Sequence, residues 1–304
     1  MSNTSPYLRV NATPRLKTPA FITAFSGWND AAEVATQAVR FLVRSWDAPR
    51  LADVDPEEFF VFTEQRPVVH LDEAAQRRID WPGNELYYRK APDGGRDCIL
   101  LIGTEPSLRW RTFVDVVLNY VGDLGSDLIV QLGGLLADVP HSRAPRLTGS
   151  ATDPYYAERL GRVNVRSSRY EGPTGIVGVM GQECRRRGIS SVSLWGNVPH
   201  YIGSTANPKV TAAMLRRLDA LLDLNLDLAE LDRSTQTFET QVADALAQDP
   251  EAQAYVRQLE AREEDEGEEV DLPPTRAQEL PSGEEVVREL EEFLKRRTED
   301  ERDG

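Results

Sequence analysis

Hydrophobic residues along the chain form two kinds of pattern, short continuous runs and runs with helical spacing. The first apolar run covers residues 21–26, and after a Gly-Trp turn a helix face is marked by Val34, Ala35, Ala38, Val39 and Leu42. The same succession recurs, with strands predicted at 97–102, 127–132 and 190–195 and helices at 109–121, 175–187 and 208–222. This alternation predicts an α/β fold with a central mixed, largely parallel sheet flanked by helices.

Three short extended runs interrupt this alternation between the first predicted helix and the second long strand. They cover residues 58–63, 67–70 and 85–90, with turn-forming residues near them. Short runs of this kind are typical of strands that pair antiparallel. We expect one α/β domain to contain all of these elements and to span residues 1–225.

The composition changes after residue 225 to polar residues that favour helices. Residues 226–262 predict a helical C-terminal extension that packs on the domain, with Pro250 dividing two helices. Residues 263–280 have the composition of a solvated acidic linker. Residues 281–304 predict an amphipathic helix and tail, and so short a helix needs a surface to dock on, either on its own body or on a partner. Its apolar stripe is the expected partner-binding surface: Val286, Val287, Leu290, Phe293 and Leu294.

Composition and charge exclude several classes of function. The 304 residues carry a formal net charge of −15 and their basic residues are scattered, so we expect no nucleic-acid partner. No apolar run reaches the ~20 residues of a membrane span, and no secretory signal is visible. Cys98 and Cys184 have no metal-ligand spacing. We therefore expect a cytoplasmic protein with no metal and no cofactor.

The segments that follow the apolar runs carry the candidate chemistry, because α/β proteins bind ligands where parallel strands end. These segments are residues 27–30, 103–110, 133–143 and 195–203, and a Val-Pro-His triplet in each of the last two could place both histidines on one rim. Carboxylates and imidazoles could act as acid and base, and arginine could pair with an anion. The candidate pocket comprises Gly27, Trp28, Asp30, Glu105, Arg109, His141, Arg143, Thr174, Asn197 and His200.

Each candidate also has a structural interpretation, and no residue is assigned as catalytic. Asp30 and Glu33 have the spacing of a capping box, and Thr174 could cap the helix that follows it. The free amides of that helix could instead hold a phosphate or a carboxylate. Trp28 and Trp110 fit plugs at the edge of the sheet better than stacking platforms. The histidines fit partners for loop backbone groups better than catalysts.

Five ordered motifs resemble those of the PAC2 family, named for a proteasome assembly chaperone, in its bacterial, actinobacterial type. They are AFSGWNDAAEVA, IGTEPSLRW, GGLLADVPHSR, EGPTGIVGVM and WGNVPHYI, and with NPKV they cover roughly residues 21–222. The resemblance implies an α/β fold similar to phosphorylase- or hydrolase-like proteins and a tendency to self-associate. It implies no defined reaction. Relatives act as chaperones for proteasome subunits, some through a C-terminal hydrophobic-Tyr-X tail that the ending TEDERDG does not match.

Two functional hypotheses follow from the motifs and the resemblance, beside a third possibility, a purely structural oligomer. The first is a non-enzymatic, homo-oligomeric protein that binds other proteins as an assembly chaperone does, with proteasome subunits as candidate partners. The strand-end rim or the terminal helix would supply its binding surface. The alternative is an enzyme or sensor that binds a nucleotide or another anionic ligand in a phosphorylase-like pocket. Convergence of the candidate side chains on one cavity distinguishes the two.

Overall fold

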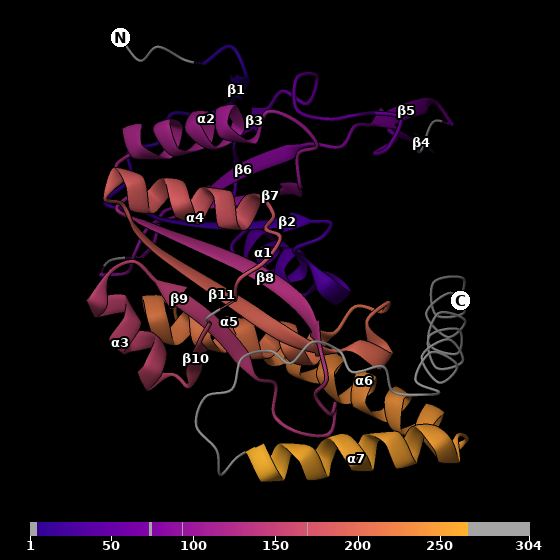
Figure 1. Cartoon of the computed structure of the whole chain (residues 1–304). Coiled ribbons are helices and arrows are strands. Elements are labelled where there is room, and N and C mark those ends of the chain that lie inside the picture. The colour runs from indigo at the N-terminus through magenta and orange to yellow at the C-terminus, as the bar shows by residue number, and fades with distance from the viewer. Residues whose placement is uncertain (1–4, 73–74, 93, 169, 267–304) are drawn as a thin grey trace.

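The computed structural model describes residues 5–72, 75–92, 94–168 and 170–266, and a nine-stranded sheet runs through it (Figure 1). The strand order is β1-β3-β6-β7-β2-β8-β11-β9-β10. Its centre is parallel and is built from β7 (Cys98–Thr104), β2 (Ala20–Ser26), β8 (Leu128–Ala137) and β11 (Ser190–Pro199). Antiparallel pairing joins β6 (Asn84–Arg89), β3 (Arg50–Val54) and β1 (Leu8–Val10) to one side of this centre and β9 (Leu147–Ala151) to the other. The short β10 (Val165–Ser167) pairs parallel with β9 at that edge. The predicted α/β fold is confirmed.

Helices cover both faces of the sheet because the central strands are apolar on both sides. Ile22 and Ala24 of β2 point to one core, and Phe21 and Phe25 point to the other. Figure 1 shows α2 and α4 on one side of the sheet and α3 and α5 on the opposite side. The covering helices are α1 (Val34–Ser45), α3 (Pro154–Arg162) and α5 (Pro208–Leu222) on the first core and α2 (Trp110–Asp123) and α4 (Ile176–Arg187) on the second.

The C-terminal extension forms two helices that add a third, smaller core. Helix α6 (Ala229–Ala247) packs on α5, and α7 (Pro250–Glu266) begins at the predicted proline. Residues 263–266, assigned to the linker from their acidity, continue α7, so that part of the prediction is wrong. The terminal helix and its apolar stripe lie outside the described residues. Within the described ranges, no helix is long and apolar enough to cross a membrane.

A separate two-stranded hairpin projects from the body, as Figure 1 shows. It consists of β4 (Val68–Leu71) and β5 (Arg77–Asp80), paired antiparallel, and every residue of both strands is exposed. The predicted strand at 58–63 is wrong, because this segment forms turns in which the amides of Phe59 and Phe60 donate to the Pro56 carbonyl. The true neighbouring strand, β3, was missed because polar residues flank its short apolar core.

Strands β8 and β11 are longer than their apolar runs, so residues 133–137 and 195–199 are strand and not the predicted loops. The two strands pair in register over ten residues, from Leu128 with Ser190 to Ala137 with Pro199. Glycine makes this close pairing possible, since a Cβ at Gly133 would lie 2.4 Å from the Trp195 ring. By its register with β2, which ends at Ser26, β8 continues about three residues past the end of that strand.

Candidate functional site

Asp30 lies after β2 and serves as a helix cap. Its carboxylate accepts hydrogen bonds from the amide of Ala35 at 2.8 Å and the amide of Thr36 at 3.3 Å, and it contacts the Thr36 hydroxyl. Burial is the largest effect on the Asp30 pKa and raises it. The predicted capping box is not formed, because Glu33 has a left-handed backbone, φ 54°, and its carboxylate bonds to Gln37. The single turn of η1 (Ala31–Glu33) shifts the start of α1 away from Asp30.

Glu105 caps α4 from the end of a different strand, β7. Its Oε1 accepts hydrogen bonds from the amide of Ile176 at 2.7 Å and from Asn29 Nδ2 at 2.6 Å. Position 175, just before the helix, needs glycine, because a Cβ at Gly175 would lie 2.5 Å from the same carboxylate oxygen. Thr174 is exposed and does not cap the helix, contrary to that prediction. The helix start therefore does hold a carboxylate, and it is one of the chain's own.

The two tryptophans near the strand ends differ. Trp110 packs partly buried against the second core, and its indole N–H donates to the Pro106 carbonyl, as expected for a plug. Trp28 is 62% exposed, so the same interpretation is wrong for Trp28. Arg109 lies at the start of α2, where its guanidinium pairs with Glu58 and donates to the Tyr7 hydroxyl at 3.0 Å. This places Arg109 on the surface.

His141 and His200 both contact Tyr201, which lies in the short helix η2 (His200–Ile202) after β11. The Tyr201 hydroxyl lies 2.7 Å from the amide nitrogen of His141 and 2.8 Å from its Nδ1. Both imidazole rings meet the phenol ring edge to face, at centroid distances of 5.8 and 5.6 Å. Burial, followed by the charge of Lys209, lowers the pKa of His141 to about 4. The imidazole of His141 is therefore neutral at physiological pH.

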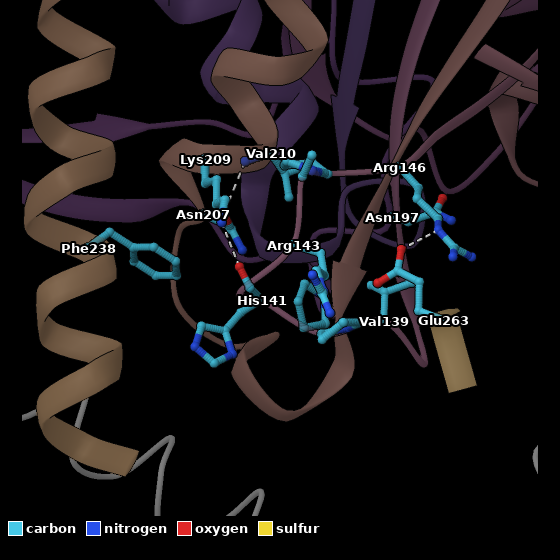
Figure 2. Close-up of a pocket in the computed structure, with 14 residues that line it drawn as sticks. Val139, His141, Arg143, Arg146, Asn197, Asn207, Lys209, Val210, Phe238 and Glu263 are labelled. Atoms are coloured by element: carbon cyan, nitrogen blue, oxygen red, sulfur yellow. Dashed lines mark hydrogen bonds and ion pairs between the residues drawn. The ribbon is translucent and has the colours of Figure 1, made fainter. Parts of the chain in front are cut away.

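A narrow recess lies beside this cluster, and Figure 2 shows the side chains that line it. Lys209 Nζ donates to the His141 carbonyl at 2.7 Å and pairs with Glu239 of α6 at 2.7 Å. Arg146 Nε lies 2.5 Å from Glu263 Oε1 of α7. The remaining free volume is about 10 Å³, which is room for about one water molecule. The extension helices therefore close this recess with their carboxylates.

Only part of the predicted set converges on this recess. His141, Arg143 and Asn197 line it, and His200 is next to it through Tyr201. The others lie at the ends of β2 and β7, around the start of α4, or on the surface, because β7 and β11 are three strand intervals apart, about 14 Å. Sequence reasoning missed four lining or closing residues, of which only Lys209 lies in a quoted motif, NPKV: Arg146, Lys209, Glu239 and Glu263.

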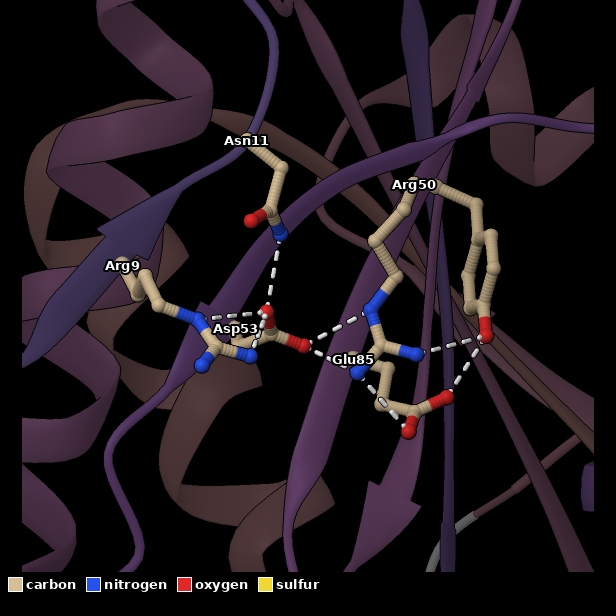
Figure 3. A network of polar contacts seen from close by, with 6 residues as sticks. Arg9, Asn11, Arg50, Asp53 and Glu85 are labelled. Atoms are coloured by element: carbon tan, nitrogen blue, oxygen red, sulfur yellow. Dashed lines mark hydrogen bonds and ion pairs between the residues drawn. The ribbon is translucent and has the colours of Figure 1, made fainter.

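A second polar cluster joins the edge strands β1, β3 and β6 and is shown in Figure 3. Asp53 accepts hydrogen bonds from Arg9 at 2.9 Å, Asn11 at 2.8 Å and Arg50 Nε at 2.7 Å, and Arg50 also pairs with Glu85 at 2.8 Å. Burial opposes ionisation of Asp53, but these donors outweigh it and lower its pKa. The cluster ties neighbouring strands together. Its charges are satisfied internally, so we treat it as structural.

Metal-ligand groups are absent from the part of the chain that the structure describes. No set of three or more histidine, cysteine, aspartate or glutamate side chains within those ranges could hold a metal ion. Cys98 and Cys184 are buried free thiols, and burial raises their pKa values to about 12 and about 11. Both cysteines pack in the cores, and their thiols are protonated and unreactive at neutral pH.

Comparison with known proteins gives one consistent relationship. The PAC2 family model matches residues 24–246. A PAC2 family protein from Streptomyces avermitilis is 39% identical, with TM-score 0.72 over 78% of this chain and 99% of that one. A Mycobacterium tuberculosis proteasome-assembly chaperone homologue is 38% identical, with TM-score 0.71 and the same coverage. An archaeal proteasome activator from Pyrococcus furiosus shares the fold, at 23% identity and TM-score 0.63 over 78% of this chain and 97% of that one. A search of curated proteins gives no match. The chain belongs to the PAC2 family.

Proposed function

We propose that this protein is a non-enzymatic, cytoplasmic binding protein of the assembly-chaperone kind. The observation that supports this most directly is the strand-end rim, which we define as four large apolar side chains exposed near the ends of β2, β7 and β8. They are Trp28 at 62%, Leu108 at 47%, Leu135 at 36% and Leu136 at 54% exposed. Exposed apolar groups rimmed by polar residues are typical of protein interaction sites.

The polar residues next to the rim argue against a reaction there. Asp30 and Glu105 are occupied as helix caps, and Arg109 pairs with Glu58. A drug-sized ligand fills a cavity of about 300–1,000 Å³, whereas the recess beside His141 has room for about one water molecule. The recess that holds His141, Arg143 and Asn197 therefore leaves no room for a nucleotide or a similar small molecule.

The relatives suggest what kind of partner to test. One of the similar structures is a proteasome-assembly chaperone homologue at 38% identity. We propose that proteasome subunits bind the strand-end rim, with the terminal stripe that begins at Val286 as a second contact. Large aromatic and aliphatic residues at the centre of such a surface dominate the binding energy.

We also propose that the protein self-associates through the β4-β5 hairpin. Val69, Leu71 and Ile79 share one face of the ribbon by strand alternation, and they are 56%, 67% and 53% exposed. An isolated two-stranded ribbon is marginally stable in water, so a second copy that covers this face would stabilise it. Sedimentation of a Val69→Ser, Ile79→Ser variant should show a smaller species than the parent. An unchanged species would contradict this part of the proposal.

Partner recovery tests the binding function directly. The tagged protein is incubated with purified proteasome α and β subunits, and the bound subunits are quantified by mass spectrometry. A Trp28→Ser, Leu136→Ser variant should lose at least about 90% of the recovery, since each lost anchor costs about 1–2 kcal/mol. The matched control is Tyr155→Ser, which removes an equally exposed aromatic residue, 57%, from α3. Equal recovery by the rim variant and the control would contradict the rim as the binding surface. No recovery by the parent would contradict proteasome subunits as the partner.

A further inference from the structure

Helix α7 is docked on the body by an apolar stripe and two carboxylates. Ala252, Val256 and Leu259 are buried in the third core, where they join side chains of η2 and α6. At the next turn, the Glu260 carboxylate accepts a hydrogen bond from the Ser142 hydroxyl, and Glu263 pairs with Arg146. The side chains of Arg146 and Glu263 are only 18% and 17% exposed. The docking surface for α7, as we use the term below, consists of Ser142, Arg146, Tyr201, Phe238, Val242 and Leu246.

The contact sequence of α7 occurs a second time in the chain. Residues 255–260 read YVRQLE, and residues 286–291 read VVRELE. Aligned without a gap, both segments have valine, arginine, leucine and glutamate at the same four positions, so Val287, Leu290 and Glu291 correspond to the buried Val256 and Leu259 and to the anchor Glu260. Two of the three buried residues of α7, and the glutamate that bonds it to Ser142, thus have identical counterparts in the terminal segment.

Both copies of this repeated sequence lie outside the part of the chain that matches the family. The family match ends at residue 246, within α6, so α7 and the terminal segment both lie beyond it. The docking surface itself belongs to the matched region, from Ser142 to Leu246. One surface of the family domain is therefore covered by α7, and a second segment of similar contact sequence follows α7 in the same chain.

We propose that the terminal segment, residues 282–297, docks on the surface that α7 occupies and exchanges with α7 within one chain. The connection is long enough. Residues 267–282 can extend to about 50 Å, whereas the 17 residues of α7 span only about 25 Å. The segment can therefore fold back along the path of α7 and reach the same apolar surface. The inference concerns the chain alone and does not depend on the proposed partner.

The two segments differ at the buried Ala252, which corresponds to Gly283, and at the ion-paired anchor Glu263. The difference at Glu263 makes the exchange testable. The residue that corresponds to Glu263 is Leu294, which cannot pair with Arg146. Arg146 therefore stabilises the docked α7 and contributes no ion pair to the docked terminal segment. Replacing Arg146 with glutamine should shift the exchange toward the terminal segment by about tenfold, the change expected when a charged hydrogen bond is lost.

Site-specific cross-linking of the full chain measures both docked states. A short bis-maleimide is applied to Ser142→Cys, Glu260→Cys for docked α7 and to Ser142→Cys, Glu291→Cys for the docked terminal segment. The native Cys98 and Cys184 are buried and react slowly. The matched control is Ser142→Cys, Glu292→Cys, because the next residue on a helix points about 100° away. We expect the Glu291 pair to cross-link faster than this control, with the product remaining at monomer mass.

Arg146→Gln then provides the second measurement. It should raise the initial cross-linking rate of the Glu291 pair about tenfold and lower that of the Glu260 pair. Arg185→Gln, an exposed arginine on α4, should change neither rate. Circular dichroism confirms that each variant is folded. Equal rates for the Glu291 pair and its control overturn the proposal, and so does a product at twice the monomer mass, which would assign the surface to a second copy of the chain.

Discussion

The central parallel strands and the β4-β5 hairpin are built from similar residues and have opposite environments. Ile22 and Val130 in the centre are fully buried, whereas Val69 and Ile79 in the hairpin are 56% and 53% exposed. The difference arises because crossover helices cover both faces of the centre, and no described element packs on the ribbon as they do. Apolar β-branched residues thus specify an extended backbone without specifying burial.

The largest expected effect in this comparison is the loss of a core aromatic ring. Phe25 is fully buried and packs edge to face on Phe113, with ring centroids 5.9 Å apart. Phe25→Ala should lower the free energy of unfolding by about 3–5 kcal/mol. Val68→Ala, on the face of the hairpin opposite to Val69 and Ile79, should change it by no more than about 0.5 kcal/mol. Urea denaturation measures both, and a similar loss in the two variants would show that this second face of the hairpin is buried in solution.

A smaller effect is expected for the carboxylates of the two regions. Asp30 accepts two backbone amides that have no other acceptor in α1, so Asp30→Ala should cost about 1–3 kcal/mol. The side chain of Asp80 is 72% exposed and pairs with His70 at 3.4 Å. Asp80→Ala should cost at most about 0.5 kcal/mol. Thermal melts of both variants and the parent test whether Asp30→Ala is the more destabilising change. A greater loss of stability for Asp80→Ala would contradict the prediction.

The smallest expected effect is a pH dependence that separates Asp30 from exposed acids. Burial raises the pKa of Asp30 in the native state above its ordinary 3.8. The native protein then binds this proton more tightly than the unfolded chain, so the contribution of Asp30 to stability falls as pH rises from 3.8 through the raised value. The free energy of unfolding of the parent relative to Asp30→Asn should decline over that interval. A difference that grows with pH would mean that the native pKa is lowered.

Local patterns predicted the long elements of the fold well. Helix α5 has its predicted bounds, and the four central strands begin within a residue of their apolar runs or at their first residue. The errors occur where tertiary contacts override the local pattern. Residues 58–63 look extended, but burying Phe59 against Phe113 favours turns there. Strands β8 and β11 continue past their apolar runs because each supplies the other's backbone partners.

The candidate site was predicted less well, since it depends on which side chains meet across the fold. The joint position of His141 and His200 was inferred correctly from their repeated triplet. The role of Glu105 could not be inferred, because the amide that it caps is 71 residues away, at Ile176. Arg146 and Glu263 likewise meet only when α7 docks. No spacing in the sequence encodes these pairs.

The sequence by itself determined the alternation of the four central strands with their main covering helices, the family, and the acidic character of the chain, because these depend on residue identity and periodicity. The tertiary structure decided which apolar strands are covered, which carboxylate caps which helix, and how little room is left beside His141. These outcomes depend on contacts between distant residues, whose free energy is gained only when crossovers bring the elements together.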